Sequence, residues 1–305
     1  MPFNPILLVA AGIVVLAGCW GWYLVRGSTA TPAAAWAVAA AAACLLEAAA
    51  SGSGWLTDPA TRGCVRLVVA ALAVCPIMSL LGAKRPQHGI WQFIVGTLAV
   101  VLALPAASAL LVRPGSMPEV HPLERGFFVV LLAVGWMNFV GTRHGPAATL
   151  ATVGLVGLLR GGLPGGDLGR GLGSMLDAGA AACVAAGAVL AAGQSAWQAS
   201  RAAERDNPVL RIEGPYLALR ETLGAAWTLR IAERFNAVAA ERRWPCRLRF
   251  GGLVTEQADG PSGWERDATR CIRALLRRFV SDAWLARHGE SPIHDATPYS
   301  TSSGH

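Results

Sequence analysis

Three charged residues lie inside otherwise apolar stretches of this sequence and are its sharpest candidates for chemistry. Glu47 lies one turn from the end of one stretch, Arg66 at the start of the next, and Asp177 about a turn into a later one. Charges inside a membrane are costly, so they pair with one another or face a water-filled cavity. We expect all three at the same level of the membrane, with the arginine between the two carboxylates. This arrangement favours a structural ion pair whose charged groups reach the membrane interface. The alternative interpretation is that the three residues form the rim of a ligand-binding site for a polar or charged solute.

The rest of the sequence offers no recognisable catalytic motif. There is no Ser/His/Asp set, and the glycine-rich stretch 161–173 contains no Gly-Lys-Ser/Thr, so it fails the test for a phosphate loop. The seven cysteines show no spacing typical of a metal site or a disulfide framework. The sequence therefore predicts no catalytic residue, no cofactor and no metal.

Two loops carry titratable side chains whose roles stay open. The loop 82–89 contains two cations and an imidazole, which could hold a lipid phosphate or simply set the topology. The loop 113–125 contains two carboxylates, an imidazole and three prolines. Acid–base chemistry is conceivable in that loop, but the prolines favour a stiff, extended linker.

The elements that must position these residues are membrane-spanning helices. The chain is 53% hydrophobic and only 15% charged, against about a quarter charged in soluble domains. A helix needs about 20 apolar residues to cross the hydrocarbon. Seven candidate spans are predicted, at 5–25, 32–50, 64–82, 90–112, 126–142, 147–163 and 172–193. The fifth and sixth are short and should form a hairpin turning at 142–146, so six spans is the alternative.

Polar and small residues within the spans are expected to pack the helices together. Gln92 and Asn138 are predicted to form hydrogen bonds between helices rather than to bind a solute. The seventh span carries small residues four apart, beginning at Ala178 and Gly179. That spacing favours close packing within the bundle or at a dimer seam.

The character of the sequence changes abruptly near Gln194, where most of the charged residues begin. We therefore predict a transmembrane domain over residues 1–194, a soluble tail domain over 195–290 and a disordered C-terminus over 291–305. Basic residues in the connections on one side, and three arginines shortly after the last span, place the tail in the cytoplasm. The expected location is the bacterial inner membrane, with a multi-pass topology.

The first span contains a short motif that competes with this interpretation. Leu16-Ala17-Gly18-Cys19 resembles a lipoprotein cleavage box in which Cys19 would be acylated. However, no basic residue precedes the apolar run, which continues past Cys19 to aromatic residues typical of an interfacial belt. The sequence favours an uncleaved span.

The tail is predicted to fold as helix, strand, helix. Apolar residues recur every fourth position from Leu219 to Phe235, which indicates a helix beginning at Gly214-Pro215. Residues 246–250 alternate between apolar and basic, as a half-buried strand does. A capping box at Ser262-x-x-Glu265 begins a second helix, which should stop at His288-Gly289.

A single strand needs a partner. The sequence offers 209–212 as a second strand; otherwise another protomer or another protein completes the sheet. The predicted fold class is thus an all-α polytopic membrane protein with 6–7 transmembrane helices and a small C-terminal α+β (helix–strand–helix) cytoplasmic module.

Two functions are compatible with this architecture. The first is a non-catalytic membrane protein whose tail binds a protein partner, a second copy of itself or the membrane lipids. The second is a transporter or channel component with a polar outer vestibule around Glu47, Arg66 and Asp177. A nucleic-acid partner is not expected, because the net charge of +7 includes no basic run with interleaved aromatics.

Overall fold

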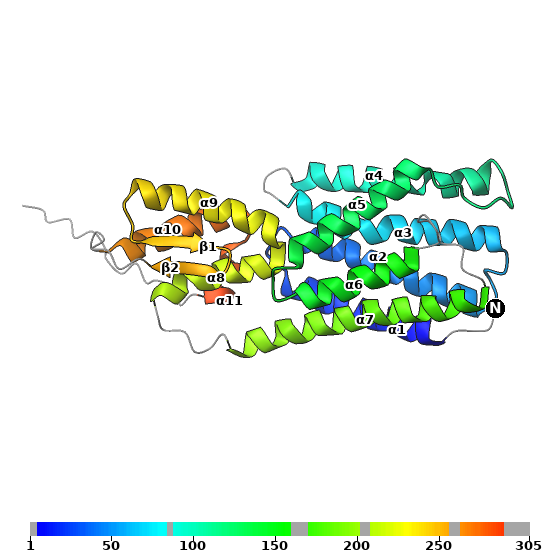
Figure 1. The fold of residues 1–305 in the computed structure, drawn as a ribbon, viewed down its shortest axis with the longest axis horizontal. Coiled ribbons are helices and arrows are strands. Elements are labelled where there is room, and N and C mark those ends of the chain that lie inside the picture. Colours follow the sequence, from blue (N-terminus) through cyan, green and yellow to red (C-terminus); the bar gives the residue numbers. More distant parts are fainter. Residues whose placement is uncertain (1–4, 84–87, 160–169, 202–207, 256–262, 290–305) are drawn as a thin grey trace, which may run out of the picture.

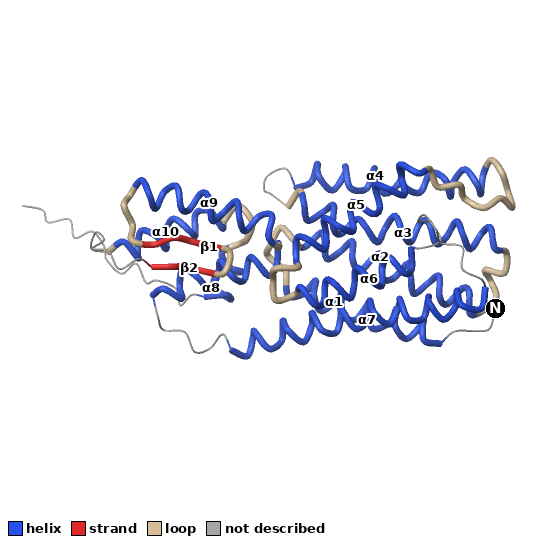
Figure 2. Tube along the Cα trace, viewed as in Figure 1, coloured by secondary structure: helices blue, strands red, loops and turns tan. Residues whose placement is uncertain are grey.

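The computed structural model describes residues 5–83, 88–159, 170–201, 208–255 and 263–289. Two bodies lie end to end along one axis: an apolar helical bundle and a smaller mixed module (Figures 1 and 2). The bundle consists of α1 (Pro5–Leu24), α2 (Thr31–Gly52), α3 (Pro59–Leu81), α4 (His88–Leu111), α5 (Pro122–Phe139), α6 (Gly145–Leu159) and α7 (Arg170–Arg201). The module consists of α8 (Pro208–Leu223), α9 (Ala225–Glu241), β1 (Cys246–Arg249), β2 (Gly252–Thr255), α10 (Trp264–Leu276) and α11 (Asp282–Gly289).

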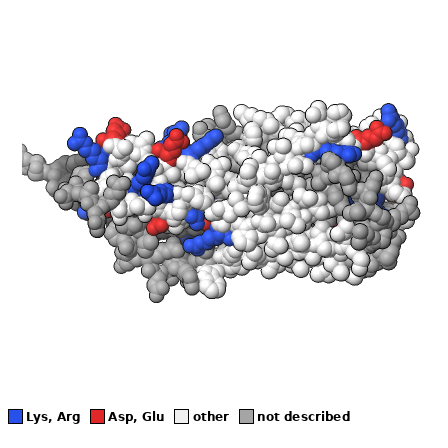
Figure 3. Space-filling view, in the orientation of Figure 1, with Lys and Arg blue, Asp and Glu red and all other residues white. Residues whose placement is uncertain are grey.

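Among the described helices, α1, α2, α3, α4 and α7 are long and apolar enough to cross a membrane. The bundle face in Figure 3 has a broad uncharged band next to the module, as a surface that meets lipid should. The predicted fifth and sixth spans form α5 and α6, and the chain turns between Phe139 and Gly145 as expected. They are shorter than the others, at 18 and 15 residues, and α5 runs obliquely across the bundle (Figure 1).

Small residues bring α6 and α7 together, as the spacing in the seventh span predicts for packing within the bundle. A Cβ added at Gly154 would lie 2.5 Å from the Ala180 carbonyl oxygen, and one at Gly187 would lie 2.8 Å from that of Ala147. These positions exclude any side chain, so the two backbones are in van der Waals contact there. The boundary expected near Gln194 falls inside α7, which continues to Arg201.

The module has its own core, and the predicted apolar stripe faces it. Leu219, Leu223, Ile231 and Phe235 are all buried there. The single helix predicted for this segment is nevertheless wrong, because the chain breaks at Gly224 into α8 and α9. Gly224 has φ +78°, a left-handed conformation that other residues adopt only with strain. The stripe survives because both helices pack on one core.

The predicted strand is confirmed as β1, but its expected partner is wrong. Residues 209–212 lie in α8, and β1 instead pairs antiparallel with β2 through a two-residue turn at Phe250 and Gly251. The side chain of Asn236 covers the other edge of β1. Its amide donates to the Leu248 carbonyl at 2.8 Å, and its oxygen accepts from the Leu248 N–H at 2.7 Å. Asn236 therefore occupies the place that a third strand would take.

The second predicted helix is also divided, into α10 and α11. The Ser262 capping position lies outside the described residues, and Gly263 is the N-cap of α10, with no side-chain cap bond. Val280, between the two helices, forms an antiparallel β-bridge with Ser28 in the turn after α1. This contact with the bundle explains the break. The described part of α11 extends to Gly289, and the residues after it lie outside the described part of the chain, so the stop at His288-Gly289 stays a prediction.

The module is docked on the turns that follow α1, α3 and α5. Thr29 N–H donates to the Phe279 carbonyl at 2.7 Å, and Trp227 Nε1 donates to the Leu80 carbonyl at 3.0 Å. Buried Asn138 bonds both sides of the α8–α9 break, because it donates to the Leu223 carbonyl at 3.0 Å and accepts from the Ala226 N–H at 2.9 Å. The bundle and module thus share a continuous hydrogen-bonded joint.

A buried ion pair lies next to this joint. Arg220 Nη2 contacts Glu221 Oε1 at 2.6 Å, and Arg220 Nη1 donates to the Phe250 carbonyl at 2.9 Å. Glu221 Oε2 accepts from the backbone N–H of Arg143, in the turn between α5 and α6, at 2.9 Å. Buried Tyr216 donates to the Arg249 carbonyl at 3.1 Å, and burial raises its pKa to about 12, so it stays a neutral donor.

Candidate functional site

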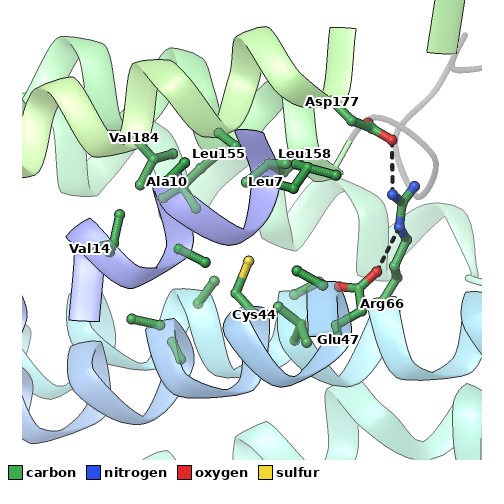
Figure 4. A pocket seen from close by; sticks show the side chains of 18 of the residues that line it. Leu7, Ala10, Val14, Cys44, Glu47, Arg66, Leu155, Leu158, Asp177 and Val184 are labelled. Atoms are coloured by element: carbon green, nitrogen blue, oxygen red, sulfur yellow. Dashed lines mark hydrogen bonds and ion pairs between the residues drawn. The ribbon is translucent and has the colours of Figure 1, made fainter. Parts of the chain in front are cut away.

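The three predicted site residues meet at the end of the bundle away from the module. Arg66 Nε lies 2.9 Å from Glu47 Oε1, and Arg66 Nη2 lies 2.8 Å from Asp177 Oδ2. The guanidinium therefore bridges α2 and α7 from its own position on α3 (Figure 4). The expectation that an arginine lies between the two carboxylates at one level is met by this geometry. We call Glu47, Arg66 and Asp177 the ion triad.

The position of Arg66 depends on how α3 begins. Asp58 caps this helix, since its carboxylate accepts from the Thr61 N–H at 2.8 Å and from the Thr61 hydroxyl at 2.7 Å. These hydrogen bonds lower the pKa of the exposed Asp58 carboxyl, because they favour its charged form. Pro59 follows at the first helical position, where its missing N–H costs nothing. The cap fixes the start of α3 two turns before Arg66.

The ion triad stands at one end of a cavity that the sequence did not reveal. Its volume is about 810 Å³, and it lies between α1, α2, α3, α6 and α7. All the charged lining residues are at the triad end: the triad itself and Arg62. Further into the bundle the walls are apolar, as Val14, Leu155 and Val184 illustrate (Figure 4).

The cavity is deep but does not extend through the bundle. Its lining on α2 extends from Gly52 to Ala37, a rise of about 22 Å at 1.5 Å per residue. Its lining on α3 extends from Arg62 to Ile77, a similar distance. The hydrocarbon core is about 30 Å thick. The lining therefore covers less than the full thickness of the hydrocarbon core and does not form a continuous pore across it.

The most exposed side chain of the triad is that of Arg66. The Arg66 side chain is 45% exposed, whereas those of Glu47 and Asp177 are 14% and 11% exposed. The carboxylates hold the Nε and Nη2 edge of the guanidinium. Among the described residues, Nη1 has no hydrogen-bond partner, so two N–H donors stay available at the head of the cavity.

Other predicted polar residues have structural roles. Gln92 Oε1 accepts from Trp36 Nε1 at 2.9 Å and from the Ser79 hydroxyl at 3.1 Å, and so joins α2, α3 and α4 as expected. Asn138 is a hydrogen bonder too, but it bonds the module rather than a neighbouring span. The local sequence around Asn138 gives no sign that its side chain bonds residues more than 80 positions away.

The two loops with titratable residues contribute little to the site. Residues 84–87 lie outside the described part of the chain. In the other loop, His121 caps α5 by accepting from the Leu123 N–H at 3.3 Å. Within the described residues, no group of His, Cys, Asp or Glu side chains could hold a metal ion.

Comparison of the chain with models of protein families, with curated proteins and with solved structures found no match.

Proposed function

We propose that this protein is a non-catalytic integral membrane protein that binds an amphipathic molecule in the cavity. The apolar body of the ligand fills the inner part of the pocket, and its polar head contacts the ion triad. The observation that carries the proposal is the segregation of the lining, with every charged side chain at one end of a deep apolar pocket. Ligand pockets are typically concave and mostly apolar, with a few placed polar groups.

This proposal modifies the transporter hypothesis suggested by the sequence. The polar vestibule around Glu47, Arg66 and Asp177 becomes the head of a pocket whose walls are mostly hydrophobic. An open channel for a polar solute would need polar groups along its whole length. A mostly apolar pocket with charged groups at one end fits a carrier or receptor for an amphiphile.

The alternative is a tail that recruits a partner through a strand edge, and for this role the outer edge of β1 is occupied at Leu248. β2 supplies the missing strand, and Asn236 satisfies the outward-facing N–H and C=O of Leu248. A protein partner or second copy therefore has no free backbone pair at Leu248 to extend the sheet.

For the topology, we propose that α1–α7 all cross the inner membrane of a bacterium, with the module in the cytoplasm. Arginines from both bodies gather at the junction and support this orientation: Arg26 after α1, Arg230 over the Trp227 ring at 5.1 Å, and Arg287 on α11. Excess basic charge at one face is typical of the cytoplasmic side. Fusions after Gly27 should be active with a cytoplasmic reporter, and fusions after Gly52 with a periplasmic one.

Binding of dansyl-labelled undecanoic acid to the protein in lipid nanodiscs tests the cavity. Its fluorescence should rise above that of empty nanodiscs. Ala40→Phe, which fills the inner part of the pocket, should weaken binding about tenfold, because a phenyl ring displaces at least two methylene groups worth about 0.8 kcal/mol each. The matched control is Ala39→Phe, since Ala39 is the exposed neighbour on the same helix. Equal binding by the two variants, or no signal above empty nanodiscs, would sink the proposal.

A further inference from the structure

A second surface of the protein has the shape of a lipid-binding site, on the module side of the bundle. Leu16, Trp20 and Tyr23 lie at i, i+4 and i+7 on α1, which is one face of a helix. All three are exposed, at 73%, 47% and 56%. This face changes from aliphatic to aromatic over about 10 Å toward the end of the helix, in the order found where acyl chains give way to headgroups.

Two arginines complete this face where α1 ends. The Arg26 guanidinium lies 5.1 Å from the centroid of the Trp22 ring and 5.6 Å from that of Tyr23. Arg287, on α11, donates through Nη2 to the Arg26 carbonyl oxygen. The two residues are 261 positions apart in the chain, so only the docked module brings the Arg287 guanidinium to the backbone of Arg26.

Neither arginine has an acidic partner in the part of the chain that the structure describes. Within the described residues, no ion pair involves Arg26 or Arg287, although both side chains are exposed. The acidic residue of α11 closest in sequence, Asp282, pairs with Arg277 at 2.9 Å. By contrast, the buried Arg220 is paired with Glu221. The junction therefore presents two uncompensated guanidinium groups, which suit the geometry of phosphate oxygens.

We propose that an anionic phospholipid of the leaflet on the module side binds here. Its headgroup phosphate lies between Arg26 and Arg287, and one acyl chain lies along Leu16 and Trp20. Because Arg287 belongs to the module and Arg26 to the bundle, the lipid headgroup bridges the two bodies. The site is separate from the cavity, whose lining on α1 extends from Pro5 to Val14, and does not depend on its occupancy.

Native mass spectrometry of the full chain released from nanodiscs tests the site. We expect phosphatidylglycerol to stay bound to the wild-type protein and phosphatidylcholine to be lost. Each of Arg26→Gln and Arg287→Gln should weaken retention about fivefold and the double variant about 30-fold, since a basic residue near an anionic surface contributes about 1 kcal/mol. Arg266→Gln is the matched control, because Arg266 is an exposed arginine on α10, whose first turn lies at the end of the module away from the bundle (Figure 1).

Three outcomes would overturn the proposal. The first is equal retention of the two lipids by the wild-type protein. The second is a loss of retention in Arg266→Gln as large as in the double variant, which would indicate only a general effect of net charge. The third is full displacement of the lipid by soluble glycerol phosphate, which would make this a site for a free phosphate ester. The cavity variant Ala40→Phe should retain phosphatidylglycerol normally, so this test and that of the cavity can fail independently.

Discussion

Replacement of Asn138 by leucine should loosen the joint between bundle and module without unfolding either. Asn138 makes two hydrogen bonds across the joint, to the Leu223 carbonyl and from the Ala226 N–H. Leucine has a similar volume but leaves both backbone groups unpaired where Asn138 is 8% exposed. Each lost bond is worth about 1 kcal/mol, and a buried group left unsatisfied costs about 1–3 kcal/mol.

We therefore expect a loss of about 2–4 kcal/mol in the local stability of the joint. This corresponds to an increase of about 30-fold to 800-fold in its opening equilibrium. Hydrogen–deuterium exchange on the full chain in nanodiscs measures this directly, at the amides of residues 220–230.

The control for this experiment is Asn236→Leu. Asn236 also makes two hydrogen bonds to backbone groups, but both are to Leu248 within the module. Its loss should raise exchange at the Leu248 amide and leave residues 220–230 protected. If Asn138→Leu and Asn236→Leu gave the same exchange pattern, or if Asn138→Leu changed nothing at 220–230, the assignment of Asn138 as the residue that holds the joint would be wrong.

Three further predictions concern single positions. Gly224→Ala should lower the thermal stability by about 1–3 kcal/mol from backbone strain alone, and by more from a Cβ placed 2.2 Å from the Asn138 side chain; Gly251→Ala, in open space, is the control for melting. Arg66→Gln should lower the melting temperature, and neutralising both carboxylate partners in the same chain should recover most of the loss, since unpaired buried charges are what costs stability. Burial lowers the pKa of His288 in the folded protein, so protonation of this histidine favours the unfolded state. The contribution of neutral His288 to stability is therefore complete above about pH 6.5 and is lost as the pH falls through the pKa of the folded protein. A pH series of melting curves should be flatter in His288→Gln.

The local patterns in the sequence predicted elements better than their connections. Alternation of apolar and basic residues correctly indicated β1, and the apolar stripe from Leu219 to Phe235 correctly identified the buried face. The break at Gly224 was missed because residues on both sides of it point to the same core. β2 was missed because only Leu253 and Val254 give it an apolar character, and a strand that short depends on pairing rather than on pattern.

In the candidate site too, the sequence predicted one part and missed another. The ion triad could be predicted because unpaired charges in a membrane are costly, which leaves few ways to arrange one arginine and two carboxylates. The cavity behind the triad could not, since its walls are mostly alanine, leucine and valine, as in any packed bundle. Whether such residues touch one another or enclose a space is decided by helix crossing and spacing, which a single sequence does not encode locally.

The three turns that hold the module have a consequence for the order in which the protein is assembled. Thr29, Leu80 and Asn138 follow or end α1, α3 and α5, so each is synthesised before the module that binds it. In the seven-span topology proposed above, failure of any helix from α2 to α7 to enter the bilayer would move every later turn, and the module, to the opposite face. The docking surface would then be divided between the two sides of the membrane, and the module could not complete its contacts. In that topology, the joint can close only when every helix from α2 to α7 has been inserted in the correct direction.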